Sequence, residues 1–579
     1  MQEGGRLGIV VAGSLSEGLK VRLDAGTSVE DMRVGKFVKI RGEQHDFFCL
    51  VTDVLLDAAN SRVLADPPPE DEPFLRAVLA GTVTYGLLQV EPRLMLARDV
   101  DTSAEAGPQP VKTIPTHFST AYVASEADFE RVFGADGPGR FAIGEPLDMA
   151  VPIRLNLRRF VERSNGVFGK SGTGKSFLTR LLLCGIIQHR VAANLIFDMH
   201  SEYGWEAHTE EHGVRAKGLK QLFRGQVFIY TLDPKSARER GVPYDGELRI
   251  GRDEIDLDDI ALLHDELRLH PTAIESGSLV VQQHGDRWLS ELLAMDGDAL
   301  RAFCDRQGAN LQSLSALRRK LQANIATLPF VADRGYGLDE IVKRLEQGQH
   351  VVLEFGQHRR LLPYMLVANI ITRLIHRKWI TKTEQYLRSK DEGQRPQPLM
   401  ITIEEAHRFL NPEAARQTSF GTIARELRKF FVTLLVVDQR PSGIDPEVLS
   451  QLGTRVTAQL NDERDIDAIF TGVAGGSKLR QMLASLDSRE QALILGHAVP
   501  MPVMFRVRKY DEAFYAALDA FGAQREQIVR PAPPRGGDPS PRPSTVDPLA
   551  PDNVVEFPQP RAPLPNGDRP RAYDELFPD

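Results

Sequence analysis

The first hundred residues alternate short apolar runs with turn-forming residues, and no long helical pattern interrupts them. Five stretches have the length and apolar content of strands: Gly8–Ala12, Leu19–Leu23, Phe37–Arg41, Phe47–Leu55 and Val83–Val90. Closely spaced strands without helices predict a small β-barrel over residues 1–100, in which the proline-rich segment 66–73 is a loop. Such a barrel is either a nucleic-acid-binding module or a structural collar. The collar is the favoured interpretation, because these strands carry no visible basic aromatic face.

The pattern changes beyond residue 100. We interpret residues 101–150 as a connector with little regular structure apart from a short helix at Glu126–Phe133. From about Val151, buried strands alternate with helices, which predicts an α/β core. Between about Asp256 and Leu345 apolar residues recur at helical spacing, which predicts a helical bundle inserted into that core. The expected domains are therefore the barrel, the connector, a core of residues 151–255 and 346–515, the insertion 256–345, and an extension 516–579.

The extension differs in composition from the rest of the chain. Of the 37 prolines, 14 fall in the last 50 residues. This density predicts a disordered or extended tail from about residue 530. The final stretch Ala572–Phe577 mixes aromatic, apolar and acidic residues, so it would suit docking on a partner or an adjacent subunit, or else it is a solvated terminus.

Composition narrows the class of protein only moderately. The 579 residues are enough for several domains, and the formal net charge of −8 argues against a uniformly basic nucleic-acid coat but not against a local basic surface. The three cysteines, Cys49, Cys184 and Cys304, form no C-x-x-C pair, which suits a reducing cytosol. No signal pattern or membrane-length apolar run is present, so we expect a cytoplasmic protein without membrane association.

One glycine-rich stretch carries the clearest chemistry. Residues Gly169–Ser176 match G-x-x-x-x-G-K-[ST] in full, after the short apolar run Asn165–Phe168 and before a helical apolar run. Glycines at these positions let backbone N–H groups turn toward a phosphate at the start of a helix. The candidate nucleotide-binding residues are Gly169, Lys170, Ser171, Gly172, Thr173, Gly174, Lys175, Ser176 and Phe177. Lys175 would reach the β- and γ-phosphates, and the Ser176 hydroxyl would bind Mg²⁺.

Acidic residues follow two other apolar strands. In Pro398–His407 an apolar strand ends in Glu404 and Glu405, the arrangement of a Walker B strand. Glu404 would act through water on Mg²⁺, and Glu405 would polarise the attacking water. The strand before Asp198 leaves Asp198 and Glu202 at the same edge, where they could hold water, Mg²⁺ or a neighbouring subunit's arginine, or cap the next helix.

A basic helix and a polar amide complete the set of candidates. The helix Phe420–Phe431 carries Arg425, Arg428 and Lys429 and leads into a buried strand, after which Gln439 stands where a γ-phosphate sensor is needed. A basic residue of this helix could reach the next subunit's nucleotide as an arginine finger, or it could be a surface charge.

Together these motifs resemble the HerA family of hexameric DNA translocases within the FtsK-like P-loop ATPases. The resemblance rests on Gly169–Ser176, Asp198–Tyr203, Ile403–His407, Ala424–Lys429 and Asp438–Ser442, and covers residues from about 8 to 510. It implies an α/β, RecA-like P-loop ATPase core with an N-terminal β-barrel and a helical insertion. It also implies a homo-hexamer with nucleotide at the subunit boundaries and double-stranded DNA in a central pore, and that Arg163 acts across the interface beside Arg425 or Arg428.

The resulting hypothesis is an ATP- and Mg²⁺-dependent DNA translocase. The family resemblance implies a nuclease partner, commonly NurA, in DNA end resection and double-strand-break repair, or else a defence effector in an anti-phage complex. Two alternatives remain: a conjugative or export ring ATPase, and a nucleotide switch without motor activity. No N-K-x-D element is present to read guanine, and both Glu404 and Glu405 are present, which argues against a passive switch.

Overall fold

The computed structural model describes residues 4–98 apart from 66 and 70, residues 107–208, and residues 215–529 apart from 359, 417, 418, 474, 475, 488 and 489. The proline-rich tail from residue 530, including the expected docking stretch Ala572–Phe577, lies outside the described residues.

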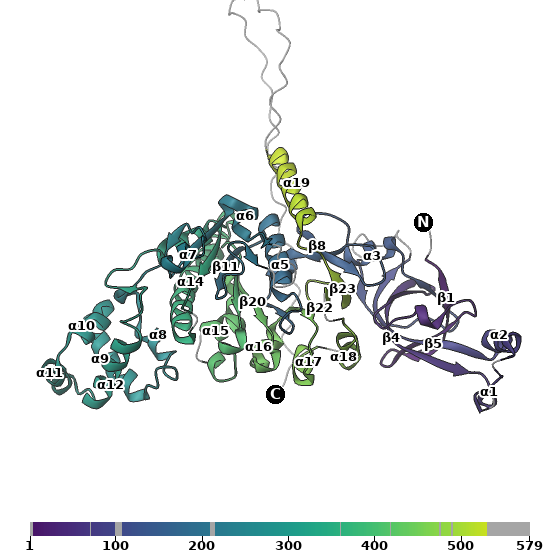
Figure 1. The fold of residues 1–579 in the computed structure, drawn as a ribbon, viewed down its shortest axis with the longest axis horizontal. Coiled ribbons are helices and arrows are strands. Elements are labelled where there is room, and N and C mark those ends of the chain that lie inside the picture. Colours follow the sequence, from purple (N-terminus) through teal and green to yellow (C-terminus); the bar gives the residue numbers. More distant parts are fainter. Residues whose placement is uncertain are drawn as a thin grey trace, which may run out of the picture. The chain divides into compact units, whose positions relative to one another are not determined.

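The N-terminal strands close into a barrel, which confirms the prediction (Figure 1). The strand order is β2-β1-β7-β3-β4-β5-β6, and an additional pairing of β2 with β5 closes the circle. Apolar side chains such as Val21, Ile40 and Val90 fill its interior and are fully buried. The strands are β1 (Arg6–Ser14), β2 (Gly18–Leu23), β3 (Phe37–Arg41), β4 (His45–Ala58), β5 (Thr84–Ala97), β6 (Gln109–Pro110) and β7 (Thr120–Val123).

The region interpreted as a connector contains more regular structure than expected. Strand β7 pairs with both β1 and β3, so it is part of the barrel. Helix α3 (Glu126–Phe133) forms where predicted, with a capping box at Ser125. Strand β8 (Arg140–Pro146) already belongs to the core sheet. The prediction of little regular structure is therefore wrong for the described part of this region, because short strands that pair only with distant partners leave a weak local pattern.

A twelve-stranded sheet forms the core. Its order is β15-β14-β18-β11-β19-β20-β10-β21-β22-β23-β8-β9, parallel from β15 to β21 and antiparallel from there to β9. Every residue of β11, β18, β19 and β20 is buried, as expected for parallel strands covered on both faces. The remaining bounds are β9 (Ile153–Asn156), β10 (Asn165–Phe168), β11 (Ala193–Asp198), β14 (Val227–Thr231), β15 (Gly246–Glu247), β18 (His350–Glu354), β19 (Leu399–Glu404), β20 (Val432–Asp438), β21 (Thr454–Ala458), β22 (Gln491–Gly496) and β23 (Val503–Val507).

The expected start of the core needs correction. The core begins before Val151, since β8 starts at Arg140. Strand β8 pairs with β23, and β9 forms the edge of the sheet. The expected boundary is wrong because β8 and β9 precede the phosphate-binding loop in sequence but pair at the far side of the sheet.

Helices of varied length connect the strands. They are α4 (Leu157–Val161), α5 (Lys175–His189), α6 (Leu219–Phe223), α7 (Pro234–Glu239), α13 (Leu338–Glu346), α14 (Leu361–Ser389), α15 (Ser419–Glu426), α16 (Pro446–Gln451), α17 (Glu463–Ile469), α18 (Gly476–Ala484) and α19 (Glu512–Val529). In the barrel, α1 (Ser61–Ala65) and α2 (Pro73–Thr82) lie between β4 and β5, and the sequence did not predict them.

The helical insertion forms as predicted. It contains α8 (Leu257–Ala261), α9 (Pro271–His284), α10 (Trp288–Ala294), α11 (Gly297–Gln307) and α12 (Leu311–Asn324). At its base, short strands β16 (Ile250–Gly251) and β17 (Val331–Ala332) pair in parallel.

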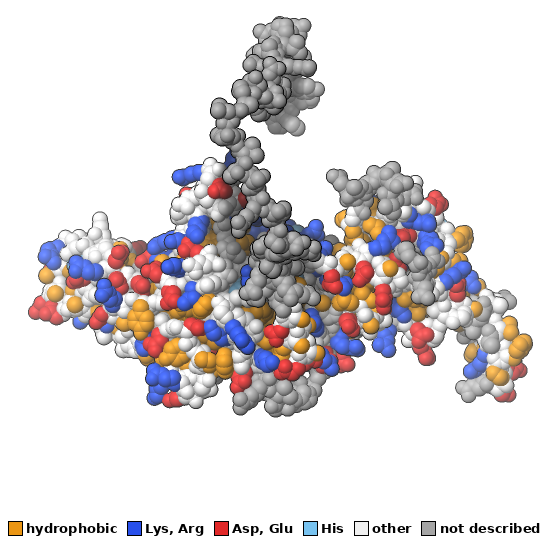
Figure 2. All heavy atoms as spheres, turned by 90° about the horizontal axis from the view of Figure 1, so that it is seen from above, with side chains coloured by type: hydrophobic (Ala, Val, Ile, Leu, Met, Phe, Trp, Pro, Cys, Tyr) orange, Lys and Arg blue, Asp and Glu red, His pale blue; other side chains and the backbone are white. Residues whose placement is uncertain are grey.

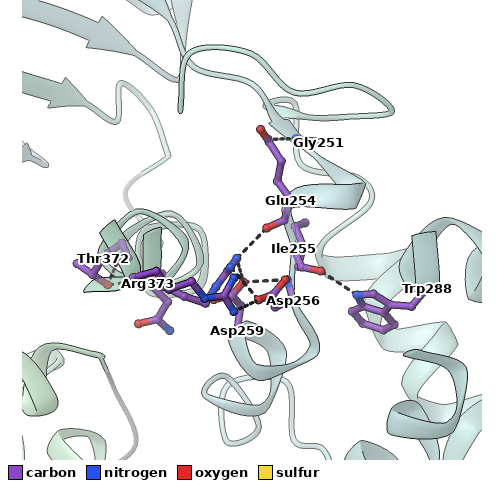
Figure 3. Close-up of polar contacts among 11 residues, drawn as sticks. Gly251, Glu254, Ile255, Asp256, Asp259, Trp288, Thr372 and Arg373 are labelled. Carbon is purple, nitrogen blue, oxygen red and sulfur yellow. Dashed lines mark hydrogen bonds and ion pairs between the residues drawn. The ribbon is translucent and has the colours of Figure 1, made fainter. Parts of the chain in front are cut away.

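A group of charged side chains fixes α8 to α14, and we call it the Arg373 cluster (Figure 3). Arg373 of α14 donates from Nε and Nη2 to the two carboxylate oxygens of Asp259, at 3.0 and 2.7 Å. Its Nη1 lies 2.7 Å from Asp256 Oδ2, and Nη2 also donates to the Glu254 carbonyl oxygen at 2.8 Å. The Trp288 indole N–H donates to the Ile255 carbonyl oxygen at 2.8 Å. Every buried carboxylate oxygen of Asp259 therefore has a cationic partner.

The described surface is mixed in charge. Basic and acidic side chains are interspersed on the face seen in Figure 2, in keeping with the net charge of −8. Within the part of the chain that the structure covers, no helix is both long and apolar enough to span a bilayer.

Candidate active site

The carboxyl ends of five parallel strands meet at one edge of the sheet. Strand β10 ends there in the glycine-rich loop, and its neighbours end in acids: Asp198 on β11, Glu354 on β18, Glu404 on β19 and Asp438 on β20. Parallel pairing brings these ends together although they are far apart in sequence. A ligand in an open α/β sheet binds at this edge.

The glycine-rich loop turns tightly between β10 and α5. Gly169, Gly172 and Gly174 have φ angles of 156°, 79° and 87°, a region that glycine enters without strain. A Cβ at position 169 would come within 2.7 Å of Thr173 Oγ1. The Thr173 hydroxyl in turn donates to the Lys170 carbonyl oxygen at 2.8 Å, which closes the loop. The conformation therefore leaves backbone N–H groups at the start of α5 directed toward an anion.

The predicted binding residues differ in their surroundings. Ser171 and Gly172 are exposed at the tip of the loop, whereas Lys175 and Ser176 at the start of α5 are half-buried. Burial lowers the pKa of Lys175, while the nearby carboxylates of Glu405, Asp438, Glu404 and Glu202 oppose that shift. The centre of the Phe177 ring lies 5.5 Å from the Arg180 guanidinium, and the ring packs beside Tyr510. These contacts of Phe177 are with other side chains of the protein.

Glu404 is buried at the end of β19. Its Oε1 accepts a hydrogen bond from the Tyr203 hydroxyl at 2.9 Å, and its Oε2 is buried with no partner among the described residues. Burial, together with the charges of Asp198 and Glu202, raises the pKa of Glu404 well above its usual value. A buried carboxylate with an unpartnered oxygen is unfavourable unless a cation or its water shell is bound there.

Glu405 is held in an unusual conformation. Its φ of 49° lies in the left-handed region, which costs a non-glycine residue on the order of 1 kcal/mol. Gln439 Nε2 donates to Glu405 Oε1 and Oε2 at 3.1 and 3.3 Å. The two residues predicted as general base and phosphate sensor are thus in direct contact.

Asp438 and His407 form a pair that the sequence analysis did not single out. His407 Nδ1 lies 3.0 Å from Asp438 Oδ2, and the His407 backbone N–H donates to the same oxygen at 2.6 Å. The hydrogen bond with Asp438 raises the pKa of His407, and Glu405 Oε2 lies 3.8 Å from Nδ1. An acid at the end of a buried strand, next to Gln439, was a signal that could have identified this pair.

Asp198 forms the turn that follows β11. Its Oδ1 accepts from the Glu202 N–H at 2.8 Å, and its Oδ2 accepts from the Tyr203 and Gly204 N–H groups at 2.9 and 3.3 Å. Residues 199–206 form no helix, so Asp198 does not cap one, and this geometry favours a turn-forming role over metal ligation. Asp198 is fully buried, and three backbone donors account for both oxygens.

The residues present fit a magnesium ion held mainly by the nucleotide. Mg²⁺ usually keeps several waters and is bound by one or two protein groups together with phosphate oxygens. The Ser176 hydroxyl and the unpartnered Oε2 of Glu404 are such groups. The described residues contain no group of three His, Cys, Asp or Glu side chains that could hold a metal ion by themselves.

Two of the three predicted arginines lie at the opposite edge of the sheet. Arg163 precedes β10 and Arg428 precedes β20, so both lie at the amino ends of the strands. They line a cavity of about 350 Å³ with a third arginine, Arg455. Arg163 Nε is buried there without a partner among the described residues. No acidic side chain is among the described residues that line the cavity, which therefore favours an anion.

Not every predicted arginine can be placed. The backbone of Arg425 belongs to α15, but its side chain lies outside the described residues. The structure thus brings Lys175, Ser176, Glu404, Glu405 and Gln439 to one edge and Arg163 and Arg428 to the other.

A glycine-rich loop on a buried parallel strand, a lysine at the start of the next helix and paired acids on a nearby strand define a P-loop ATPase. Two family models match the sequence of this chain. The family model of the HerA helicase central domain matches residues 141–375, and the HAS barrel domain model matches residues 7–102.

Curated relatives cover most of the chain. The DNA double-strand break repair helicase HerA of Pyrococcus furiosus is 25% identical over 421 residues, which are 68% of this chain and 73% of that protein. The protein of the same name from Saccharolobus solfataricus is 25% identical over 394 residues, covering 67% and 72%. The chain is therefore a P-loop ATPase whose sequence matches the HAS barrel domain and the HerA helicase central domain.

Solved structures of other proteins are more distant. VirB4 of Thermoanaerobacter pseudethanolicus matches with a TM-score of 0.44 at 12% identity, covering 66% of this chain and 99% of that structure. The bacterial conjugative coupling protein TrwBdeltaN70 matches with a TM-score of 0.43 at 12% identity, covering 67% and 92%.

Proposed function

We propose that this protein is an ATP-driven translocase on double-stranded DNA that works as a homo-hexameric ring. One observation carries the proposal: the glycine-rich loop and the arginine-lined cavity lie at opposite edges of one sheet. A strand of seven residues such as β20 is roughly 20 Å long, which exceeds the reach of an arginine side chain. Arg163 and Arg428 therefore act on a nucleotide only if another subunit supplies it.

Such a contact is head-to-tail, and head-to-tail contacts generate rings when the rotation between subunits closes. In each site Lys175 would neutralise charge on the β- and γ-phosphates, and Glu405 would orient and deprotonate the attacking water. Gln439 contacts both oxygens of Glu405, so it would link that base to the γ-phosphate. Magnesium, held by Ser176 and through water by Glu404, would supply charge stabilisation when bound. Asp198 would shape the turn that supports Glu404 rather than bind the ion.

DNA as the substrate is supported by the curated relatives, which are named DNA double-strand break repair helicases. We propose that the chain, like them, works in double-strand-break repair, with a NurA-like nuclease as partner in DNA end resection. An effector enzyme of an anti-phage complex is the alternative partner. Identification of the proteins that co-purify with the full chain separates these two tasks.

The test of the proposal as a whole measures ATP hydrolysis with and without linear duplex DNA, and the mass of the particle by light scattering. Stimulation by DNA together with a mass of six chains is expected. A monomer whose hydrolysis ignores DNA would contradict the proposal.

The shared site has its own test by mixing two inactive variants. Lys175→Ala lacks the phosphate lysine but keeps Arg428, and Arg428→Ala lacks the arginine but keeps the loop. If Arg428 acts across the subunit boundary, mixed rings contain intact sites and regain roughly a quarter of wild-type turnover, by simple statistics of random assembly. Lys429→Ala removes an exposed charge beside Arg428 and serves as the control. Mixed rings that stay inactive would place Arg428 outside the shared site.

A further inference from the structure

We infer that Tyr203 is a positioning residue for the magnesium site, because its buried hydroxyl fixes the carboxylate of Glu404 with one oxygen left free for the ion or its water. The inference rests on the proposed role of Glu404 at the end of β19 and extends the magnesium site to Tyr203 in the turn after β11.

Tyr203 is itself immobilised from two sides. Its side chain is fully buried, and its backbone N–H donates to Asp198 Oδ2 at 2.9 Å. Asp198 also accepts from Glu202 and Gly204, so the whole turn after β11 is fixed to the end of that strand. The ring therefore presents its hydroxyl to β19 from a rigid support.

The hydroxyl acts on one oxygen of Glu404 only. The distance from Tyr203 Oη to Glu404 Oε1 is 2.9 Å, whereas Oε2 has no partner among the described residues. A carboxylate held at one oxygen has a defined orientation, and the second oxygen is then available to a cation. Without the hydroxyl, the carboxylate would be free to rotate about its terminal torsion, which has broad minima.

Tyr364 provides a matched control. It is fully buried in the same region, and burial together with the charges of Glu404 and Asp198 raises the pKa of its hydroxyl. Its hydroxyl oxygen is buried without a hydrogen-bond partner among the described residues. Tyr203→Phe and Tyr364→Phe thus each delete one buried hydroxyl close to the same acids, but only the first deletes a contact with Glu404.

The experiment titrates Mg²⁺ into each full-length variant mixed with a fluorescent, non-hydrolysable ATP analogue. For Tyr203→Phe, the Mg²⁺ concentration at half-maximal binding should rise about tenfold, the lower end for residues that orient metal ligands. For Tyr364→Phe it should stay within about twofold of wild type.

Three outcomes overturn the inference. If wild type depends on Mg²⁺ and Tyr203→Phe titrates like it, Tyr203 does not position Glu404, and the proposed function is untouched. The same holds if both variants weaken equally, since that reports a general packing loss. If wild type itself binds the analogue without any need for Mg²⁺, there is no magnesium site for Tyr203 to position and the inference fails, whereas the proposed function fails only if DNA-stimulated hydrolysis and the mass of six chains are absent as well.

Discussion

Two groups of carboxylates in this chain differ in whether cationic side chains neutralise them. In the Arg373 cluster, Asp259 is bound by a bidentate guanidinium, and Asp256 contacts the guanidinium groups of both Arg373 and Arg377. At the carboxyl edge of the sheet, the acids outnumber the half-buried Lys175, and Glu404 keeps an unpartnered oxygen. Burial raises the pKa of both Asp259 and Glu404. At Asp259 the hydrogen bonds from Arg373 oppose that rise, whereas at Glu404 the opposing hydrogen bond comes from the neutral Tyr203 hydroxyl.

The difference separates a structural role from a chemical one. When a buried acid is paired with a cationic side chain, the protein itself neutralises its charge, and the pair fixes the geometry of the elements that it joins. A buried group of acids with too few cationic side chains is neutralised only when a ligand supplies positive charge. Such an excess of buried negative charge is typical of functional sites. The first group joins α8 to α14, whereas the second faces the glycine-rich loop. Changes at the two groups should therefore be visible in different measurements.

The largest effect is expected from Glu405→Gln. Removing the proposed base should lower ATP turnover about 10³-fold, within the range for general base catalysis, because an amide cannot take up the proton of the attacking water. Binding of a fluorescent ATP analogue should remain within a few-fold of wild type, because Gln439 can still bond to the new side chain. Glu413→Gln, an exposed acid in the same segment, is the control. Turnover at the wild-type level would remove Glu405 from the base role.

Much of this site could be predicted because its parts are local. The loop Gly169–Ser176 and the pair Glu404 and Glu405 each lie within one short motif, and each follows a buried strand whose end must reach the same edge. The five expected barrel strands and the helical insertion were also recognisable, since their apolar periods are regular over several residues.

The remainder depends on contacts that span long stretches of sequence. Tyr203 lies 201 residues from Glu404, and β8 pairs with a strand more than 350 positions later, so neither relation leaves a local pattern. The strand β7, with four residues, is too short to carry a period that separates it from a loop. Asp198 was ambiguous because the same carboxylate suits a cap and a metal, and only the three backbone donors around it show that it forms a turn instead.

The next largest effect should come from breaking the Arg373 cluster. Arg373→Met leaves Asp259 buried without its cation, which costs ~3–5 kcal/mol in comparable buried pairs. Arg377→Met removes an exposed partner of Asp256 and should cost under ~1 kcal/mol. Hydrogen exchange of residues 257–294 is the measurement, because it reports the local opening of α8–α10 without assuming that the whole chain unfolds in one step. Equal protection in the two variants would show that the cluster does not hold the insertion.

The smallest effect concerns Glu354, the acid at the end of β18 beside Asp198. Burial and the charge of Asp198 raise the pKa of Glu354 from 4.5 to about 7, against the opposing effect of Arg240 at 2.9 Å. An acid whose pKa is higher in the folded state stabilises that state below its unfolded value, and this contribution is lost as pH rises from about 4.5 to 7. The Glu354→Gln variant cannot ionise at this position, so its free energy of unfolding relative to wild type should increase as the pH rises from about 4.5 to 7. The increase should be on the order of 1 kcal/mol once the opposing effect of Arg240 is included.

Differential scanning fluorimetry at a series of pH values, without nucleotide, measures the corresponding rise in the melting temperature of the variant relative to wild type. Glu145→Gln, which deletes an exposed carboxyl on β8, controls for the loss of one negative charge. If the difference in melting temperature between Glu354→Gln and wild type instead shrinks with rising pH, Arg240 keeps Glu354 ionised. Glu354 would then not belong to the group of acids without matched cations, and that group would extend only from β11 to β20.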